Sequence, residues 1–370
     1  MKVGIVGITE NDYIRGVERY TLELTRYLAK LYPDSTFYLL RGAWQMYYKE
    51  LSRLENVRVF TVENLENSKL HRHFFTAFKL FNFLREKNIE IDIIHYNNTL
   101  PIIRKTPIPS VITIHDIAEF FVPEKYSNIQ RLYRRQMLRI SVKNVDKIIT
   151  VSKFSANSII SKLSICGEKV IPIYLGIEHF YRKIDLCFIS KKPQKYDYLL
   201  YWSVIERSKG VIETIKAFNL VNKKYPDLKL IIIGKKGNAF YDFIKLVKSN
   251  NNIKHLDYVD DNELARYIRH AKAILFPSKH EGFGFPPLEA FVLNNNIITS
   301  NNTSLGEITS KFAIQVNPTN IQGLCKAIEN LLEHPLTFNE KEKKEILSQF
   351  SWKNTAKKTF EVYKSLLGGK

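Results

Sequence analysis

The sequence predicts an α/β protein built from two doubly wound domains. The chain has 370 residues, which is long for a single hydrophobic core. Short apolar runs typical of buried strands alternate with amphipathic helical segments, as in parallel sheets covered by helices. The alternation stops near residue 181 and restarts near residue 197, after a charged stretch without periodicity.

Composition and charge narrow the possible partners. Hydrophobic residues make up 45% of the chain and charged residues 25%, which is ordinary for a globular protein. The formal net charge of +19 is spread over both halves and favours anionic partners, namely nucleotides, membrane surfaces or nucleic acid. No helix-turn-helix, zinc or RNA-binding signature accompanies this charge, so a nucleic-acid-binding or other anion-binding protein is the weaker alternative.

Cysteine usage and hydropathy predict a cytoplasmic location. Cys166, Cys187 and Cys325 show no metal or disulfide spacing, which indicates reduced packing residues. The N-terminal residues MKVGIVGITEND lack the apolar core of a signal peptide. No run approaches the roughly 20 apolar residues of a membrane span. Membrane contact is expected only as peripheral attachment at the inner face of the cytoplasmic membrane.

The first element is a strand from Lys2 to Gly7, followed by a polar loop and a helix that opens at Gly16. Pro33 ends this helix. A strand, a glycine loop and a helix together suggest that Gly16 lets the backbone approach a phosphate. A simple turn glycine is the alternative.

Further strands are expected at about 36–41, 57–62 and 91–95, alternating with helices. The helices at 69–87 and 130–143 are basic on one side and apolar on the other. Such a helix either packs its apolar face on a sheet or lies at a membrane surface near a lipid-linked acceptor.

The strand SVITIHDI, residues 110–117, ends in His115 and Asp116. Ligands of open α/β sheets bind beyond the carboxyl ends of the strands, which places His115 at a ligand site. The alternative is a capping or packing histidine.

The second half begins with a strand, a polar loop and a helix that starts at Lys209 and Gly210. A lysine at a helix start can meet a phosphate, and the alternative is a solvated lysine. The next strand ends in a turn from Gly234 to Gly237. Asp260 and Asp261 precede a later helix and are expected to cap it rather than to act as catalysts.

The stretch 276–290, FPSKHEGFGFPPLEA, shows the strongest functional pattern. A buried strand leads through a glycine-rich turn to a helix with Pro286 and Pro287 at its start, so free N–H groups can bind an anion. Glu281 in the turn and Glu289, expected in the first helical turn, can both accept hydrogen bonds from hydroxyl groups. This predicts a pocket for a phosphorylated, hydroxyl-rich ligand. The alternative is an ordinary joint with a solvated Glu281 and a capping Glu289.

This stretch resembles the E-x7-E signature of the retaining glycosyltransferases of family 4, which have the GT-B fold. The resemblance covers nearly the whole chain and is most specific over about 197–318. It implies two Rossmann-like, doubly wound domains that face each other across a cleft. The implied division is an acceptor-binding domain at 1–181, a linker at 182–196, a nucleotide-sugar donor domain at 197–349, and a terminal helix at 350–370 that packs back on the N-terminal domain.

The resemblance also implies roles for single residues. Glu281 and His115 should contact the transferred sugar, and Glu289 should hold the ribose. Lys209 should stabilise the leaving diphosphate, so it joins Glu281 and His115 as a catalytic residue. The implied donor-binding residues are Gly16, Arg207, Lys209, Gly234, Tyr258, Val259, Phe283, Gly284, Phe285, Leu288 and Glu289.

No D-x-D motif stands at a strand end, so the leaving group is expected to be stabilised without a metal ion or other cofactor. By resemblance the reaction is retaining hexosyl transfer, with GDP-mannose favoured over a UDP-hexose. The implied acceptor is a glycan or a lipid-linked oligosaccharide of a bacterial surface polysaccharide such as lipopolysaccharide. An epimerase or hydrolase of nucleotide sugars with the same GT-B fold is the rival.

Overall fold

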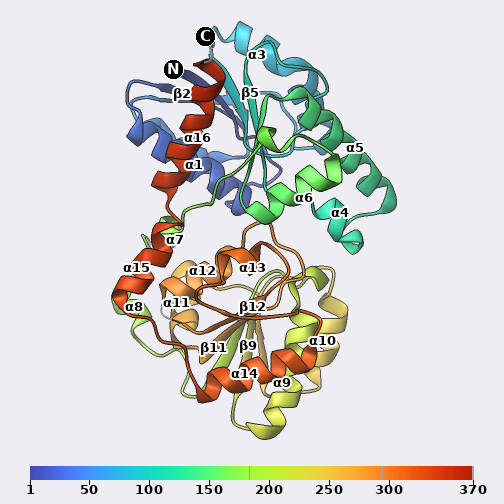
Figure 1. The fold of residues 1–370 in the computed structure, drawn as a ribbon, viewed down its shortest axis with the longest axis vertical. Helices are drawn as coiled ribbons and strands as arrows, with labels where there is room; N and C mark the ends of the chain where they lie inside the picture. The colour runs from blue at the N-terminus through green and yellow to red at the C-terminus, as the bar shows by residue number, and fades with distance from the viewer. Residues whose placement is uncertain (183, 294, 369–370) are drawn as a thin grey trace. The chain divides into compact units, whose positions relative to one another are not determined.

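The computed structural model describes residues 1–182, 184–293 and 295–368, and its contacts divide them into two compact units (Figure 1). Unit 1 comprises Met1–Gly176 and Gln349–Lys370, and unit 2 comprises Ile177–Ser348. The expected linker at 182–196 belongs to unit 2, where it contains a short helix, α8 (Leu186–Ile189). Lys183 of that linker and residues 369–370 of the expected terminal helix lie outside the described residues.

Unit 1 contains a seven-stranded, fully parallel sheet in the order β3-β2-β1-β4-β5-β6-β7. Its strands are β1 (Lys2–Val6), β2 (Thr36–Gly42), β3 (Val57–Val62), β4 (Ile93–Tyr96), β5 (Ser110–Ile114), β6 (Lys147–Thr150) and β7 (Val170–Pro172). In the centre, Val3 of β1 pairs with Phe37 of β2 and with Ile93 of β4. The carboxyl ends of β1, β4 and β5 therefore meet at one edge.

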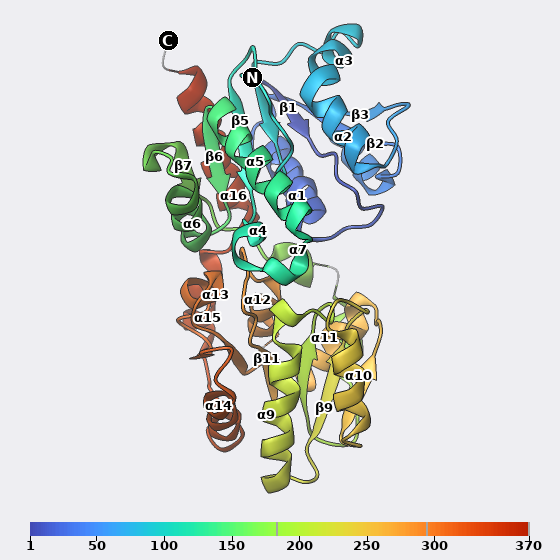
Figure 2. The same ribbon diagram turned by 90° about the vertical axis from the view of Figure 1, so that its right-hand side faces the viewer.

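Helices cover both faces of this sheet (Figures 1 and 2). They are α1 (Gly16–Leu31), α2 (Lys69–Phe74), α3 (Leu80–Glu86), α4 (Ala118–Phe121), α5 (Asn128–Asn144), α6 (Lys153–Leu163) and α16 (Trp352–Leu367), with 3₁₀ turns at Met46–Arg53, Pro123–Lys125 and Gly167–Lys169. The helices α1 and α16 lie side by side on one face, and α2, α3 and α5 lie on the other.

The helix expected over 69–87 is interrupted by a π-helical turn, Phe75–Lys79, between α2 and α3. Its inward face enters the core of unit 1 through Phe75, Leu80 and Phe83. The expectation that this segment packs on the sheet is thus correct for one of its faces.

A buried chain of polar groups links α1, the strands β5 and β4, and α16 in unit 1. The Tyr20 hydroxyl lies 2.8 Å from Thr113 Oγ1, which lies 2.7 Å from His95 Nε2. His95 Nδ1 lies 2.6 Å from the Tyr363 hydroxyl on α16. Burial lowers the pKa of His95 to about 3, so the imidazole is neutral in the folded protein. The terminal helix is thereby tied to the centre of the sheet.

Unit 2 contains a six-stranded parallel sheet in the order β10-β9-β8-β11-β12-β13. Its strands are β8 (Tyr198–Trp202), β9 (Lys229–Ile233), β10 (Ile253–Leu256), β11 (Ala273–Phe276), β12 (Ile297–Ser300) and β13 (Ile314–Val316). Its helices are α7 (Glu178–Tyr181), α8, α9 (Val211–Lys224), α10 (Phe240–Lys248), α11 (Asp261–His270), α12 (Phe285–Val292), α13 (Ser304–Ile308), α14 (Ile321–Glu333) and α15 (Glu340–Ser348), with a 3₁₀ turn at Arg207–Lys209.

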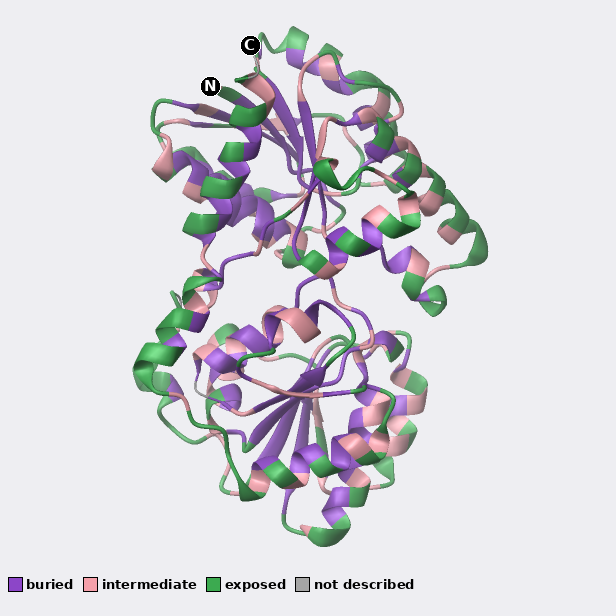
Figure 3. Cartoon of the chain, viewed as in Figure 1, coloured by how far each residue is buried: buried purple, intermediate pink, exposed green. Residues whose placement is uncertain are grey.

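The central strands of unit 2 are buried on both faces, as parallel strands between helices must be (Figure 3). All five residues of β8 and all four of β11 are buried. On one face α9, α10 and α14 contribute Phe218, Phe243 and Ile328 to the core. The apolar runs of β8 and β11 therefore form central strands, where neighbouring strands and helices remove them from water.

The structure corrects the expectation that all three cysteines are packing residues, and it also bears on membrane-spanning helices. Cys325 is buried, but Cys166 and Cys187 are exposed, so only one of the three cysteines is a packing residue. Among the described residues, no helix is long and apolar enough to cross a bilayer.

Candidate functional site

The loop that follows β11 brings Glu281 and Glu289 into one strand–loop–helix unit. Gly284 ends the loop with a φ of +102°, and a Cβ there would lie 2.3 Å from Leu305 Cδ2. The helix α12 then begins at Phe285, with Pro286 and Pro287 in its first turn. Glu289 is consequently the fifth residue of α12 and lies in its second turn, so its expected place in the first turn is wrong.

Lys209 and Glu281 form an ion pair between two neighbouring strand ends. Lys209 Nζ lies 2.7 Å from Glu281 Oε1, and the two side chains are 22% and 14% exposed. Lys209 follows β8 and Glu281 follows β11, and these strands are paired in the sheet. The structure therefore brings together the lysine expected at a diphosphate and the carboxylate expected at a sugar.

A close contact between the two loops fixes this geometry. Gly210, with a φ of +73°, approaches Pro277 so closely that a Cβ would lie 2.0 Å from the Pro277 oxygen. The Ser208 carbonyl accepts hydrogen bonds from Lys279 N at 2.8 Å and from Ser278 Oγ at 3.1 Å. The backbone before Lys209 is thus bonded to the backbone before Glu281.

Ser278 and Ser304 are buried supports of the site that the sequence did not reveal as such. Thr303 is the N-cap of α13, with its Oγ1 accepting from Leu305 N at 3.2 Å, so Ser304 is the first residue of that helix. The Ser304 hydroxyl lies 2.9 Å from the Glu281 carbonyl and 3.0 Å from the Phe283 carbonyl, to which it can donate. Both serines have no exposed surface, and a buried serine has no distinctive sequence pattern.

The residues expected around the nucleotide follow β9 and β10 at the same edge of the sheet. A Cβ on Gly234 would lie 1.8 Å from the Ser203 carbonyl, so this glycine is already required by the fold. Tyr258 is 68% exposed, with Lys235 Nζ 5.2 Å from its ring centroid. Val259 is half-buried beside it.

The side chains of three other predicted donor-binding residues are paired or buried within unit 2. Arg207 forms an ion pair with Asp242 of α10, and its N–H donates to Asn238 Oδ1 at 2.9 Å. Leu288 is completely buried. Phe283 is buried against the ring of Phe285, with centroids 5.3 Å apart. Only backbone groups of Leu288 and Phe283 can serve a ligand.

Gly16 and His115 belong to unit 1, after β1 and β5. Gly16 is the first residue of α1, and a Cβ there would meet nothing within 4 Å. His115 Nε2 lies 3.1 Å from the Asn97 carbonyl, to which it donates, and the ring meets Tyr20 edge-on at 4.9 Å. Burial lowers the pKa of His115, against the opposing effects of the Asn97 carbonyl and Asp116. Its neutral ring then presents Nδ1 as a hydrogen-bond acceptor.

Comparison with known proteins assigns this geometry to a family. The family model described as "Glycosyltransferase Family 4" matches residues 14–179, and the one described as "Glycosyl transferases group 1" matches residues 183–350. The chain belongs to glycosyltransferase family 4. It is therefore a glycosyltransferase, and its two parallel-sheet units are those of the GT-B fold.

Individual relatives and structures agree with this assignment. "O-antigen chain mannosyltransferase B" of Escherichia coli is 26% identical to the glycosyltransferase, covering 95% of this chain and 97% of that one. "O-antigen chain mannosyltransferase RfbU" of Salmonella typhimurium is 30% identical over 65% of this chain and 64% of its own. The sucrose-phosphate synthase structure from Thermosynechococcus elongatus superposes with a TM-score of 0.76 at 16% identity, covering 100% of both chains, which shows a shared fold.

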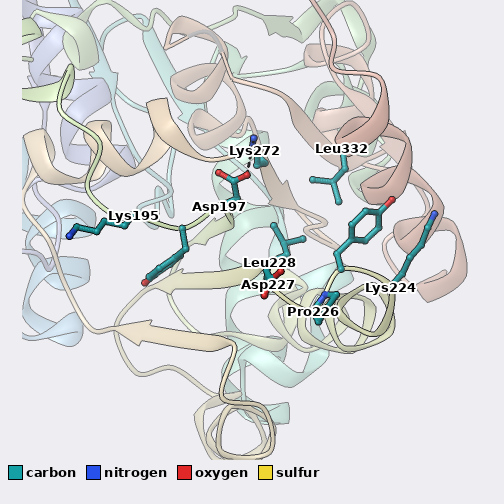
Figure 4. Close-up of a pocket in the computed structure, with 10 residues that line it drawn as sticks. Lys195, Asp197, Lys224, Pro226, Asp227, Leu228, Lys272 and Leu332 are labelled. Atoms are coloured by element: carbon teal, nitrogen blue, oxygen red, sulfur yellow. Dashed lines mark ion pairs between the residues drawn. The ribbon is translucent and has the colours of Figure 1, made fainter.

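A pocket of about 620 Å³ in the glycosyltransferase lies at the opposite edge of the unit 2 sheet (Figure 4). It is lined by Asp197, Leu228 and Lys272, which immediately precede β8, β9 and β11. Lys272 Nζ pairs with Asp197 Oδ2 at 3.0 Å within it. This pocket is therefore remote from Glu281 and Glu289, and it gives no support to the donor site.

Proposed function

We propose that this glycosyltransferase is a retaining mannosyltransferase that uses a nucleotide sugar, with GDP-mannose favoured over UDP-hexoses. The acceptor is a glycan or a lipid-linked oligosaccharide. The observation that supports it best is the paired Lys209 and Glu281 beside the loop that leads to Glu289. The names of the relatives, both mannosyltransferases of O-antigen chains, support the choice of sugar.

Each group has one task in this proposal. Glu289 binds the ribose hydroxyls, and Glu281 binds hydroxyls of the transferred sugar. Lys209, held by Glu281 at 2.7 Å before the donor arrives, turns its charge to the diphosphate as the glycosidic bond breaks. Backbone N–H groups of 283–285 position the sugar, and His115 offers Nδ1 to one of its hydroxyls.

We further propose that the reaction needs no metal ion or other cofactor. An ammonium group and a helix N-terminus together can offset the charge that develops on a leaving diphosphate. Asp260, the carboxylate that comes nearest to a D-x-D pattern, is occupied as the N-cap of α11, where its Oδ1 accepts from Glu263 N at 2.8 Å.

The test is a thermal-shift screen with GDP, UDP, ADP and their sugar conjugates, with and without EDTA. A ligand at 100 times its Kd raises the unfolding free energy by about 2.7 kcal/mol. We expect one nucleotide to raise the Tm in the presence of EDTA, and Glu289→Gln to lose most of that shift. The control is Glu345→Gln, which removes the same charge from an exposed position of α15.

Transfer assays then separate the proposal from its rival. A transferase leaves the sugar of its donor unchanged until an acceptor is added, whereas an epimerase or hydrolase converts the donor alone. Turnover of GDP-mannose without acceptor, or a Glu289→Gln enzyme with the full nucleotide shift, would contradict the proposal.

We also propose peripheral contact with an anionic membrane through unit 1. Leu70, Phe74 and Phe78 recur at every fourth position and are 76%, 47% and 48% exposed. Ile129 and Leu132 of α5 are 83% and 61% exposed, among the many basic residues of that helix. Apolar side chains beside basic ones fit the surface of an anionic bilayer.

Vesicle flotation checks the membrane contact. The protein should float with phosphatidylglycerol vesicles at low salt and much less with phosphatidylcholine. The double variant Phe74→Ser, Phe78→Ser should float severalfold less than the wild type. Tyr241→Ser, which removes an exposed aromatic ring from α10 in unit 2, should leave flotation unchanged. Equal flotation of the double variant and the wild type would exclude this surface.

A further inference from the structure

Unit 1 contains a pocket of about 270 Å³ at the carboxyl ends of β1, β4 and β5. Its lining is divided by charge. Lys69 and Arg72 of α2 and Arg134 of α5 contribute the basic side, while Glu18 and Asp116 lie among the groups that follow β1 and β5.

Arg72 is buried and only partly compensated. Its side chain is 7% exposed, and its Nη1 donates to Asn67 Oδ1 at 2.6 Å. Its carboxylate partner, Glu10, is 3.4 Å away and 70% exposed. A pair with one solvated partner contributes little, so an anion that enters the pocket can replace Glu10.

Arg134 is the least satisfied of the basic groups. Its Nε is buried and has no hydrogen-bond partner among the described residues. The nearest carboxylate oxygen, on Glu119, is 3.8 Å away, which is too far for a hydrogen bond. Burial raises the pKa of Glu119, and the positive charge of Arg134 acts in the opposite direction. A buried guanidinium N–H without an acceptor is costly and calls for one.

Lys69 completes the basic side. Its Nζ lies 4.9 Å from the centroid of the Tyr133 ring, and among the described residues Lys69 forms no ion pair. His73 lies between the helices, with Nδ1 2.8 Å from the Tyr133 hydroxyl. Burial, and then the cations of Lys69, Arg72 and Arg134, lower the pKa of His73 to about 4, so these charges are close enough to repel one another.

The carboxylates opposite accept hydrogen bonds from groups of their own loops. Glu18 accepts from Asn11 Nδ2 at 2.8 Å and from Arg15 N at 3.1 Å, as part of the cap of α1. Asp116 accepts from Ala118 N at 3.1 Å. They form a side rich in acceptors, suited to the hydroxyl groups of a sugar.

We propose that this pocket binds a sugar diphosphate, with the diphosphate at Lys69, Arg72 and Arg134 and the sugar at Asp116. Two arginine forks and an ammonium are the groups that bind a diphosphate most strongly. The ligand is the acceptor, so the inference rests on the proposed transferase function and specifies its substrate as a glycan bearing a diphosphate. The diphosphate belongs to a lipid-linked glycan, because α2 and α5 also present the exposed apolar residues described above.

The transfer test uses two synthetic acceptors that differ only at the anchor: an octyl α-mannosyl diphosphate and octyl α-mannoside. The wild type should prefer the diphosphate by at least tenfold in kcat/KM. Lys69→Ala and Arg134→Ala should each lower kcat/KM for the diphosphate by about tenfold, the loss expected for one charge-assisted hydrogen bond. Both variants should use octyl α-mannoside as the wild type does. The control is Lys79→Ala, an exposed lysine on the same helical segment.

A binding test decides the matter without turnover. With the donor site saturated by the nucleotide found in the thermal-shift screen, inorganic pyrophosphate should protect α2 and α5 from hydrogen exchange in the wild type and not in Lys69→Ala. Absence of this protection, or an equal loss on both acceptors, would overturn the proposal. A nucleotide shift with no transfer to either acceptor would instead count against the proposed function, and the exchange result would still judge the pocket.

The length of the alkyl chain distinguishes the source of the diphosphate. A lipid-linked acceptor predicts that kcat/KM rises from a methyl to an octyl diphosphate in the presence of phosphatidylglycerol vesicles. Equal use of both chain lengths would show a soluble sugar diphosphate and overturn the lipid assignment.

Discussion

Gly16 and Gly210 stand at similar places, each shortly after the first strand of its unit, yet the structure needs only one of them. Gly210 has a positive φ, and a Cβ at this position would lie 2.0 Å from the Pro277 carbonyl oxygen. Gly16 opens α1 with open space around its Cβ position. Gly210 is therefore explained by folding, whereas the fold itself does not require a glycine at position 16.

The two glycines should consequently respond in opposite ways to alanine. Gly210→Ala should lower the free energy of unfolding by at least the roughly 1–2 kcal/mol of a left-handed alanine, with a further loss from displacing the Pro277 loop. Gly16→Ala should unfold like the wild type, because alanine suits a first helical turn. It should nevertheless reduce transfer at least tenfold if a diphosphate approaches this backbone.

Denaturant unfolding and transfer kinetics on the same preparations check both expectations. Full activity of Gly16→Ala would make Gly16 an ordinary turn residue. An unchanged midpoint for Gly210→Ala would mean that the contact with Pro277 can relax at no cost.

At the same scale, sequence spacing could predict which residues lie near one another only where they are close in the chain. Glu281 and Glu289 share one loop and helix, so their proximity could be inferred. The ion pair of Lys209 with Glu281 joins residues 72 positions apart and depends on the pairing of β8 with β11. The ion pair of Arg207 with Asp242, 35 positions away, likewise depends on where α10 packs. Neither follows from a local pattern.

The segment from α2 to α3 shows what periodicity can and cannot predict about an element. Two interpretations were open, packing on the sheet or exposure toward a membrane, and the structure shows an apolar surface on each side. Phe75, Leu80 and Phe83 are buried, whereas Phe74 and Phe78 are exposed. The π turn at Phe75–Lys79 adds a residue to one helical turn, so the sequence no longer shows a single apolar stripe.

The strands were predicted more accurately than the loops because they lie in parallel sheets. A strand buried on both faces must be apolar throughout, as YLLYW and AILF are, and such runs have clear ends. Helix starts depend on backbone conformation instead. Gly284, with its positive φ, ends the loop, so α12 begins at Phe285, one residue before Pro286, and Glu289 lies in its second turn.

For the whole molecule, the alternation of strands and helices sufficed to predict two parallel-sheet units. It could not predict that the last helix completes the first unit, and only the family resemblance suggested that packing. Helix α16 contacts α1, and its Trp352, Phe360 and Tyr363 are almost completely buried. Tyr32 of the α1 end stacks on Phe360 with ring centroids 3.5 Å apart. Unit 1 is thus made from two segments separated by all of unit 2.

This arrangement predicts that the two units differ in autonomy. Residues 177–348 contain a complete sheet and its helices, so they should fold alone and keep the nucleotide shift. Residues 1–176 lack three buried aromatic side chains worth together about 5 to 9 kcal/mol, which is comparable to the stability of a whole domain. They also leave His95 Nδ1 without the Tyr363 hydroxyl that lies 2.6 Å away. This fragment should therefore not unfold cooperatively, and a peptide of residues 349–370 should restore the transition.

The matched control is the same peptide with Trp352→Ala and Tyr363→Phe, which keeps the helix but removes the indole and the hydroxyl. Calorimetry of fragment and peptide mixtures reports the outcome, since association with the folded state makes the Tm depend on peptide concentration. We expect a transition with the native peptide and a Tm at least several degrees lower, or no transition, with the altered one. A fragment 1–176 that melts cooperatively at the temperature of the intact chain would show that α16 merely covers unit 1, and that the polar chain from Tyr20 to Tyr363 adds nothing to its stability.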